Sequence, residues 1–303
     1  MFYRLRTTLA RARFDAGVRG VLATPPLAMR AAPVTVVSQL RSADLLAWLV
    51  AIKSTYPRLP GGGVVVVDDG SLTDADRATI ARHVPDARIA PLAEGQLDGL
   101  PRGGTWERLC VIGQACRTAY TIQLDADVVT LGPLDAVAAR ITANAPFALA
   151  DGPVPGRRGV TEIAAWNAAR AAREDHVQNE AEMAFARAAL PRGAQYLRGT
   201  SAFAGFPRGA DILPGLRAFS DAMRAELGDR WDAWGTEQVA SNYAVANAGD
   251  AEPLVPPAYV NHTPEAALDE ARLVHFYGTH RFRGGRYLRA ARAAVAKMGE
   301  EAR

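Results

Sequence analysis

The strongest constraint on the fold is a regular alternation of strand-like and helix-like segments between residues 34 and 124. Short β-branched or apolar runs occur at 34–37, 64–67, 88–90 and 120–124, and segments with helical spacing occupy 43–56, 73–83 and 105–117 between them. Tight hairpins join antiparallel strands, whereas parallel strands need a longer crossover that is usually a helix. We therefore expect an α/β fold, with a mostly parallel, doubly wound sheet flanked by helices.

The second half of the chain is less regular. Helical composition or spacing occurs at 161–190, 207–227, 236–247 and 286–297, a strand and a turn at 195–206, and a late strand at 273–276. With 303 residues, of which 49% are hydrophobic, the chain is long enough to bury one large core. We expect one compact domain, with a soft boundary near residue 150 between a first half, 34–150, and a second half, 151–303.

Residues 1–33 form a basic N-terminal extension. Arginines at positions 4, 6, 11, 13, 19 and 30 are interleaved with Phe2, Leu5, Leu9 and Phe14 before a Thr24-Pro25-Pro26 break. Such a segment is either an amphipathic helix on a membrane surface or partner, or a helix packed on its own domain, and the short apolar stripe favours packing. No apolar run approaches the roughly 18 residues of a membrane span, and no signal-peptide core is visible. We expect a cytoplasmic protein, with peripheral contact at the inner membrane face through residues 1–33 left open.

The charge balance and the cysteines argue against two other classes of protein. The 35 basic and 32 acidic residues give a net charge of +3 without the concentrated basic stripe that nucleic-acid binding usually needs. Cys110 and Cys116 fall in one expected helix and fit neither a disulfide framework nor a zinc site. We therefore expect a reducing compartment and no nucleic-acid partner.

The most informative motif is Asp125-Ala126-Asp127, which follows the expected strand 120–124. A hard divalent cation bound by two carboxylates can hold the oxygens of a diphosphate on its other side. In open α/β sheets such ligands bind at the carboxyl ends of the strands, where this motif falls. An isolated Asp-X-Asp triplet is a weak signal, and two solvated acids at a strand end are the plain alternative.

Two further segments place polar side chains beside this motif. Asp68-Asp69-Gly70-Ser71 ends the second expected strand, where an aspartate either accepts hydrogen bonds from a nucleoside or caps the next helix. Ser38 follows the first strand and is a further candidate for ligand contact. Far downstream, a strand delivers His275, and then Gly278 and Arg281 offer close backbone approach and a fixed cation, which favours an anion site.

These motifs resemble the GT-A glycosyltransferases, most closely the retaining family 8 enzymes, which include glycogenin and bacterial lipopolysaccharide galactosyltransferases. The segment Thr105-Trp-Glu-Arg108-Leu, with the strand and acid pair after it, resembles the family's arginine-bearing helix and Leu-Asp-X-Asp strand. The segment Gly235-Thr-Glu237-Gln238-Val-Ala-Ser-Asn242 resembles its Asp-Gln-X-X-X-Asn helix start, and His275-X-X-Gly278-X-X-Arg281 resembles its His-X-X-Gly-X-X-Lys signature. The resemblance spans residues 34–290.

The resemblance implies a GT-A fold in which 34–150 is the nucleotide-binding half and 151–303 the acceptor-side half with the C-terminal metal and diphosphate motif. It implies transfer of a hexose, with retention, from a nucleotide diphosphate sugar, UDP-linked by preference, to a saccharide, lipid-linked or protein acceptor. By this resemblance Asp125, Asp127 and His275 ligate Mn²⁺ or Mg²⁺, Gly278 and Arg281 contact the diphosphate, Arg108 reaches the donor, and Glu237 and Gln238 lie beside the sugar and its anomeric carbon. Ser38, Asp68 and Asp69 are further donor-binding candidates because of their positions at the ends of the first two expected strands.

The chain also departs from the family pattern. Glu237 stands where the family has aspartate, and Arg281 where it has lysine, which replaces a point charge with a planar fork. The segment 199–203 replaces an Asn-Ser-Gly turn, and the Asp68-Asp69-Gly70-Ser71 segment is more similar to the inverting family 2 enzymes. The expectation of retention therefore rests on fewer matching motifs than the expectation of a GT-A fold.

Three other functions remain as alternatives. The segment Asp125-Ala-Asp127-Val-Val resembles the nucleophile motif of haloacid-dehalogenase phosphohydrolases, but that motif normally opens the first strand, and the chain has only two lysines, Lys53 and Lys297. A non-catalytic sugar-nucleotide-binding GT-A protein is the second alternative. A nucleotidyltransferase is the third, and residues 37–41 lack the glycines that it usually carries. Trp231 and Trp234 either stack on acceptor sugars or belong to the core.

Overall fold

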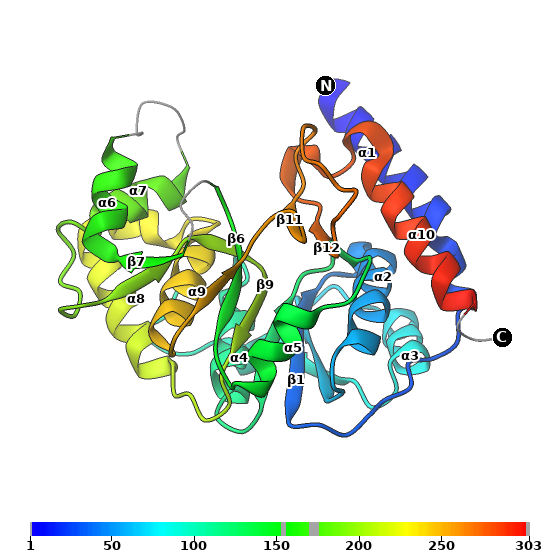
Figure 1. The fold of residues 1–303 in the computed structure, drawn as a ribbon, viewed down its shortest axis with the longest axis horizontal. Helices are drawn as coiled ribbons and strands as arrows, with labels where there is room; N and C mark the ends of the chain where they lie inside the picture. Colours follow the sequence, from blue (N-terminus) through cyan, green and yellow to red (C-terminus); the bar gives the residue numbers. More distant parts are fainter. Residues whose placement is uncertain (1, 153–155, 170–175, 301–303) are drawn as a thin grey trace. The chain divides into compact units, whose positions relative to one another are not determined.

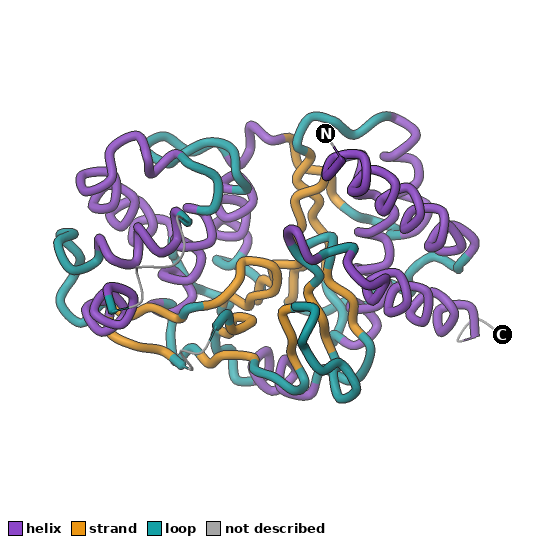
Figure 2. The backbone as a smooth tube through the Cα atoms, turned by 90° about the horizontal axis from the view of Figure 1, so that it is seen from above, coloured by secondary structure: helices purple, strands orange, loops and turns teal. Residues whose placement is uncertain are grey.

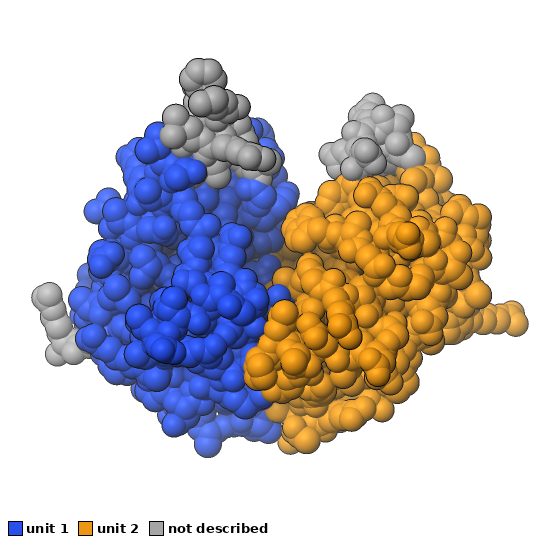
Figure 3. Space-filling view, turned by 180° about the vertical axis from the view of Figure 1, so that it is seen from behind, with its two compact units in different colours: residues 1–90, 124–138, 255–303 blue, residues 91–123, 139–254 orange. Residues whose placement is uncertain are grey.

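The computed structural model describes residues 2–152, 156–169 and 176–300, and the side chains of 2–7 and Thr279 are left aside. The chain divides into two compact units. The first comprises residues 1–90, 124–138 and 255–303, and the second comprises 91–123 and 139–254 (Figure 3). Each unit is built from helices and strands joined by short loops (Figure 2).

The first unit contains the strand and helix alternation that the sequence predicts. Its strands β1 (Val34–Leu40), β2 (Gly63–Asp68) and β3 (Arg88–Pro91) lie in that order, and α2 (Leu45–Thr55) and α3 (Asp74–His83) connect them. β1 and β2 are parallel, with Val36 opposite Val64. Gly62 precedes β2 at a φ of 117°, and a Cβ there would lie 2.1 Å from the Val34 carbonyl oxygen. The predicted α/β class with parallel strands is confirmed.

A second, three-stranded sheet of this unit joins segments that are distant in the sequence. It contains β5 (Val128–Thr130), β11 (Tyr259–Asn261) and β12 (Leu273–His275), in the order β11-β12-β5. β11 and β12 are parallel, whereas β12 and β5 are antiparallel, with His275 opposite Val128. This register places the late strand directly beside the residues that follow the acid pair.

The N-terminal extension is a helix that packs on its own unit. Helix α1 (Phe2–Val18), followed by a 3-10 turn over Arg19–Ala23, contacts α2 and lies beside α10 (Arg286–Glu300) (Figure 1). The Phe14 ring stacks on Tyr287 at 4.1 Å, and Phe14, Val18 and Val21 are buried. The apolar face of α1 therefore packs on its own unit, which is the second of the two interpretations of this segment. Within the described residues, no helix is both long and apolar enough to cross a membrane.

The second unit combines a mixed sheet with several helices. Its main strands run in the order β10 (Glu252–Leu254), β6 (Phe147–Ala150), β9 (Gly199–Phe206) and β4 (Tyr120–Leu124), and β7 (Arg157–Gly159) pairs with β8 (Gln195–Leu197). β6 is parallel to β10 and antiparallel to β9. The helices are α4 (Trp106–Ala115), α6 (Val160–Ala168), α7 (Val177–Ala184), α8 (Leu213–Leu227) and α9 (Thr236–Asn247), while α5 (Asp135–Thr142) runs from the first unit into the second.

The segment predicted to be helical at 161–190 contains two helices, α6 and α7, and residues 170–175 between them lie outside the described part of the chain. The Asn167 amide of α6 donates to the Asn179 carbonyl and to Glu182 of α7, so the two helices pack against each other. The helix predicted at 207–227 begins only at Leu213, where a proline occupies the first turn. The short elements β5, α5, β6, β7, β10 and β11 were not predicted.

Candidate functional site

The first unit gathers three metal-ligating side chains. Asp125 and Asp127 lie between the end of β4 and the start of β5, and the backbone N–H of Phe276 donates to the Asp127 carbonyl at 2.9 Å. This hydrogen bond continues the antiparallel pairing of β5 with β12, so it brings His275 to the acid pair. Ligand atoms of Asp125, Asp127 and His275 all lie within 4.8 Å of one another. The structure thus brings together the three residues predicted as metal ligands.

The orientation of His275 depends on a residue in the neighbouring strand. Asn261 lies opposite His275 in β11, and its Oδ1 accepts the Nδ1 proton of the imidazole at 2.9 Å. With the proton on Nδ1, the Nε2 lone pair faces Asp127 Oδ1 at 3.4 Å. A polar partner on the second ring nitrogen is typical of metal-binding histidines. No feature of the sequence marks Asn261, because its role follows from the register of two short strands.

Arg281 lies beside the same carboxylates. Gly278, at a φ of 53°, starts a 3-10 turn, and the Arg281 N–H donates to the Gly278 carbonyl at 3.3 Å. The turn places the guanidinium 3.6 Å from Asp127 Oδ2 and 3.5 Å from Asp44 Oδ1. Burial works against its charge, but Asp127 and Asp44 outweigh burial and raise the pKa of Arg281, so it stays protonated.

Asp44 is an organising acid that the sequence did not reveal. Besides Arg281, it binds Arg11 of α1 at 2.6 Å and forms a close ion pair with Arg41. Three arginines from separate parts of the chain therefore meet one buried carboxylate next to the metal-ligand cluster. Burial also favours a neutral Asp127, yet the positive charge of His275 when its imidazole is protonated, together with that of Arg281, outweighs burial and lowers the pKa of Asp127.

The remaining candidates of this unit have partners within the fold. Ser38 is fully buried, and its hydroxyl donates to the Leu124 carbonyl at 2.7 Å, one residue before the acid pair. Asp68 Oδ1 accepts the backbone N–H groups of Gly70 and Leu72, and its other oxygen pairs with Arg77. Asp69 accepts from the Ser71 backbone and hydroxyl. The capping residue of α3 is Thr73, in a capping box with Asp76.

The second unit contains a buried polar cluster around Glu237. Glu237, in the first turn of α9, and Arg108 of α4 are each only 2% exposed and are 3.3 Å apart. The Glu237 carboxylate also accepts from the Thr105 hydroxyl at 2.8 Å and from the Gln123 amide at 3.3 Å. Arg108 additionally donates to the Ser201 carbonyl at 3.2 Å. The structure thus pairs two residues that the sequence placed 129 positions apart.

Gln238, the neighbour of Glu237, is held by a separate chain of side chains. Its amide nitrogen donates to Gln178 of α7 at 2.7 Å, and the Gln178 amide donates to Glu182 at 3.0 Å. Glu182 is fully buried and is bound through both oxygens by Arg198. Gln178, Glu182 and Arg198 were not predicted as site residues. The only sign of them in the sequence is the four-residue spacing of Gln178 and Glu182, which places both on one face of a helix.

The two tryptophans near Glu237 have different environments. Trp231 is fully buried, its indole N–H donates to the Ser220 hydroxyl at 2.9 Å, and its ring meets Trp106 edge-on. Trp231 is therefore a core residue. Trp234, by contrast, is 76% exposed.

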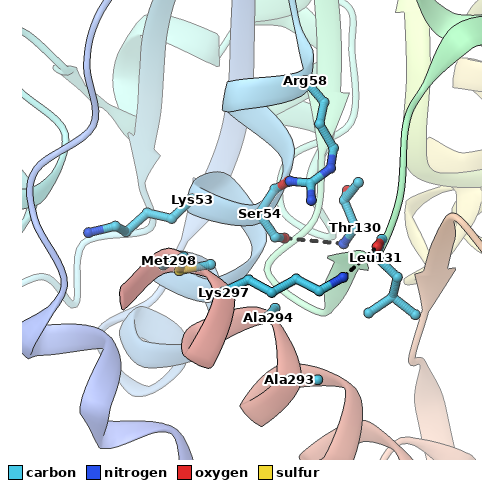
Figure 4. A pocket seen from close by; sticks show the side chains of 9 residues that line it. All are labelled: Lys53, Ser54, Arg58, Thr130, Leu131, Ala293, Ala294, Lys297 and Met298. Carbon is cyan, nitrogen blue, oxygen red and sulfur yellow. Dashed lines mark hydrogen bonds between the residues drawn. The ribbon is translucent and has the colours of Figure 1, made fainter. Parts of the chain in front are cut away.

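A small cavity of the first unit contains both lysines of the chain. Lys53 and Lys297 line it together with Arg58, Ser54, Thr130 and four other residues drawn in Figure 4, and neither Asp125 nor Asp127 is among them. Figure 4 shows the Lys53 ammonium directed away from the other side chains, and it donates to the Pro25 carbonyl at 2.5 Å. Lys297 donates to the Leu131 carbonyl at 3.4 Å. These contacts do not supply the lysine that a haloacid-dehalogenase site needs beside its aspartate.

Comparison with known proteins gives matches among solved structures only. No protein-family model matches the chain, and no curated protein matches it by sequence.

The bifunctional glycosyltransferase WbbM matches 84% of this chain with 47% of its own length, at 11% identity and a TM-score of 0.49. An active-site mutant of the galactosyltransferase LgtC matches 86% of this chain with 95% of its own, at 13% identity and a TM-score of 0.49. Core-mannan synthase A of Aspergillus fumigatus, in a form with Mn and GDP, matches 92% of this chain with 88% of its own, at 11% identity and a TM-score of 0.42. The chain spans about half the length of WbbM. All three matches are at low sequence identity and at TM-scores below 0.5.

Proposed function

We propose that this protein is a metal-dependent glycosyltransferase that moves a hexose from a nucleotide diphosphate sugar to a saccharide-containing acceptor. The observation that carries the proposal is the convergence of Asp125, Asp127 and His275 within 4.8 Å, with Arg281 beside them. Uridine diphosphate sugars and retention at the anomeric carbon are the finer expectations, and they rest on the motif resemblance alone.

The chemistry of the cluster fits a hard or borderline divalent cation. Two carboxylates and one imidazole suit Mn²⁺, because carboxylates are preferred ligands of Mg²⁺ and Mn²⁺ and the nitrogen ligand favours the transition metal. The acceptors His275 Nε2 and Asp127 Oδ1 face each other at 3.4 Å, so a cation between them would relieve their repulsion. Such a cation supplies charge neutralisation to a departing diphosphate.

The residues around the cluster have roles that follow from charge. Arg281 carries a fixed positive charge beside Asp127, so its guanidinium is placed to bind phosphate oxygens next to the cation. Transfer of the sugar leaves negative charge on the diphosphate, and an already positioned cationic side chain stabilises that charge with little reorganisation. Asp44, which binds Arg281 on its other side, holds the guanidinium in place.

On the sugar side, the proposal assigns Glu237 and Gln238 by the resemblance of their segment. The Glu237 carboxylate is oriented by Arg108, Thr105 and Gln123, so it offers a fixed acceptor for sugar hydroxyls. The Gln238 amide is half-buried, and Gln178 fixes its nitrogen. The Gln238 oxygen accepts the Ser201 backbone N–H at a long 3.5 Å, so it is the more weakly held end of the amide and the end that we assign to contact with the anomeric region.

Manganese binding tests the metal part of the proposal. We expect wild-type protein to bind Mn²⁺, measured by the loss of the free Mn²⁺ signal in electron paramagnetic resonance, and Asp127→Asn to bind it much more weakly. Asp135→Asn is the matched control, because Asp135 is an exposed acid of the same unit that pairs with Arg272. Equal Mn²⁺ uptake by all three proteins would remove the metal centre from the proposal.

Donor binding tests the substrate class. Thermal shift with Mn²⁺ and a series of uridine, guanosine and thymidine diphosphate sugars should show stabilisation that needs both metal and sugar nucleotide. Slow hydrolysis of the stabilising donor should then be detectable without acceptor. Stabilisation without any turnover would favour a sugar-nucleotide-binding protein, and turnover of simple phosphomonoesters would favour a phosphohydrolase.

A further inference from the structure

We infer that Trp234 is the stacking platform for a pyranose ring of the saccharide acceptor, an inference that rests on the proposed function. Among the described residues, the exposed large hydrophobic side chains are Leu9, Val255 and Trp234, and Trp234 is the most exposed at 76%. An exposed tryptophan is unremarkable by itself. The residues that surround Trp234 are the reason that we infer a ligand for it.

The backbone and a neighbouring ring hold Trp234 in an outward position. Gly235 follows it at a φ of 102° and caps α9, and a Cβ on Gly104 would lie 3.6 Å from the Trp234 Cα. The His176 ring meets the indole edge-on, at 6.4 Å and 81°. The His176 ring is itself fixed, because its Nδ1 accepts the Gln178 backbone N–H at 3.2 Å. Because Trp234 is still 76% exposed beside this ring, much of the indole surface remains open to a ligand.

Trp234 is continuous with the proposed sugar-binding residues. It lies three positions before Glu237, and it packs on the turn that leads into Thr105, whose hydroxyl binds Glu237 at 2.8 Å. The start of α7 contacts the same region, since His176 meets Trp234 and Gln178 binds Gln238. The exposed ring therefore lies close to the polar groups assigned to the sugar within the second unit, although Glu237 itself is buried.

The chemistry of this surface matches a pyranose. A pyranose ring has a face of C–H groups, which packs on an aromatic ring, and an edge of hydroxyls, which needs hydrogen-bond partners. The indole contacts the imidazole of His176, and the neighbouring segments carry the hydroxyl of Thr105, next to Gly104, and the neutral amide of Gln238 in the first turn of α9. A nucleobase is the other flat ligand that stacks on tryptophan, and a comparison of uridine with saccharides distinguishes the two.

Fluorescence quenching tests the inference without any requirement for turnover. Trp48, Trp106 and Trp231 are buried, so acrylamide should quench mainly Trp234, with Trp166 as the half-exposed remainder. We expect a panel of methyl pyranosides and disaccharides to include members that protect the wild-type protein from quenching. The same saccharides should not change the quenching of Trp234→Phe, whose remaining tryptophans serve as the internal control.

Transfer kinetics give the second readout, with the acceptor that the panel identifies. Trp234→Ala should raise the acceptor KM by about tenfold, the order expected for loss of one aromatic contact, and Trp234→Tyr should restore most of the affinity. The rise in acceptor KM should exceed any change in donor KM. Leu9→Ala, which removes the next most exposed apolar side chain, should keep the wild-type acceptor KM.

Two results would overturn the inference. One is a negative result with saccharides, either because none of them changes the quenching of wild-type protein or because Trp234→Ala leaves the KM of the acceptor that does so as in wild type. The other is protection by uridine or UDP but by none of the saccharides, which would make Trp234 a nucleobase contact. Failure of the proposed function is a separate outcome, because wild-type protein would then show neither Mn²⁺ binding nor donor hydrolysis.

Discussion

Asn261→Ala is expected to weaken Mn²⁺ binding although Asn261 is not itself a metal ligand. Asn261 Oδ1 accepts the proton on His275 Nδ1 at 2.9 Å, and this contact keeps the Nε2 lone pair toward Asp127 Oδ1, 3.4 Å away. Without Asn261, the imidazole proton is free to move from Nδ1 to Nε2. The Nε2–H group would then donate a hydrogen bond to Asp127, and a metal ion would have to displace that proton. Loss of such a partner typically lowers metal affinity about 10- to 100-fold, or ~1.4–2.7 kcal/mol.

Titration of Mn²⁺ by electron paramagnetic resonance measures this effect directly. Asn261→Asp should retain wild-type affinity or exceed it, because a carboxylate accepts the same proton more strongly. Asn247→Ala, which removes an asparagine that binds Gln195 in the second unit, should bind Mn²⁺ as wild type does. Urea unfolding of each variant separates a folding defect from a binding defect. A folded Asn261→Ala protein with wild-type Mn²⁺ affinity would refute the tautomer argument.

Four further predictions follow from other parts of the structure. Gln178→Leu removes the partner of the Gln238 amide, and we expect it to lower kcat about tenfold with a smaller change in donor KM, measured by steady-state kinetics. Burial lowers the pKa of Lys53 from its ordinary value of 10.5 to about 8, so between these two pH values the unfolded protein binds more protons than the folded protein. The free energy of unfolding of the wild type, compared with that of Lys53→Met, should therefore rise by up to about 3 kcal/mol from pH 8 to pH 10.5. Phe14→Ala should lower the free energy of unfolding by about 3–5 kcal/mol, measured by urea denaturation. If the N-terminal extension also contacts membranes, Arg13→Glu on its exposed side should reduce cosedimentation with anionic vesicles, and unchanged cosedimentation would count against that contact.

The first half of the fold could be predicted because its signals are local. The runs at 64–67 and 120–124 are apolar or β-branched and match β2 and β4 to within one residue at each end. The alternation with helices then requires parallel pairing, whichever residues fill the core. The second half was harder. An alanine- and arginine-rich stretch has helical propensity throughout, so propensity alone does not show that α6 and α7 are separate helices packed through Asn167.

The candidate site shows the same division between local and register-dependent information. Asp125, Asp127 and His275 could be named from their motifs, and the antiparallel pairing of β5 with β12 brings them together. The strand β5 has only three residues, and its one visible signal was the Val128-Val129 pair after the acids. Asn261 could not be named, because an asparagine in a short strand acquires a role only once its cross-strand partner is known.

The N-terminal helix shows why deletion experiments on this chain need careful design. Phe14 stacks on the Tyr287 ring, and the guanidinium of Arg281 lies 5.6 Å from the centre of the same Tyr287 ring. Arg11 of the same helix binds Asp44, which in turn contacts Arg281. Removing residues 1–33 therefore takes away both an aromatic and an ionic support of the arginine assigned to the diphosphate. A truncated protein that loses donor binding would show that α1 supports this site, and only substitutions on the exposed face of α1, such as Arg13→Glu, test contact with a membrane.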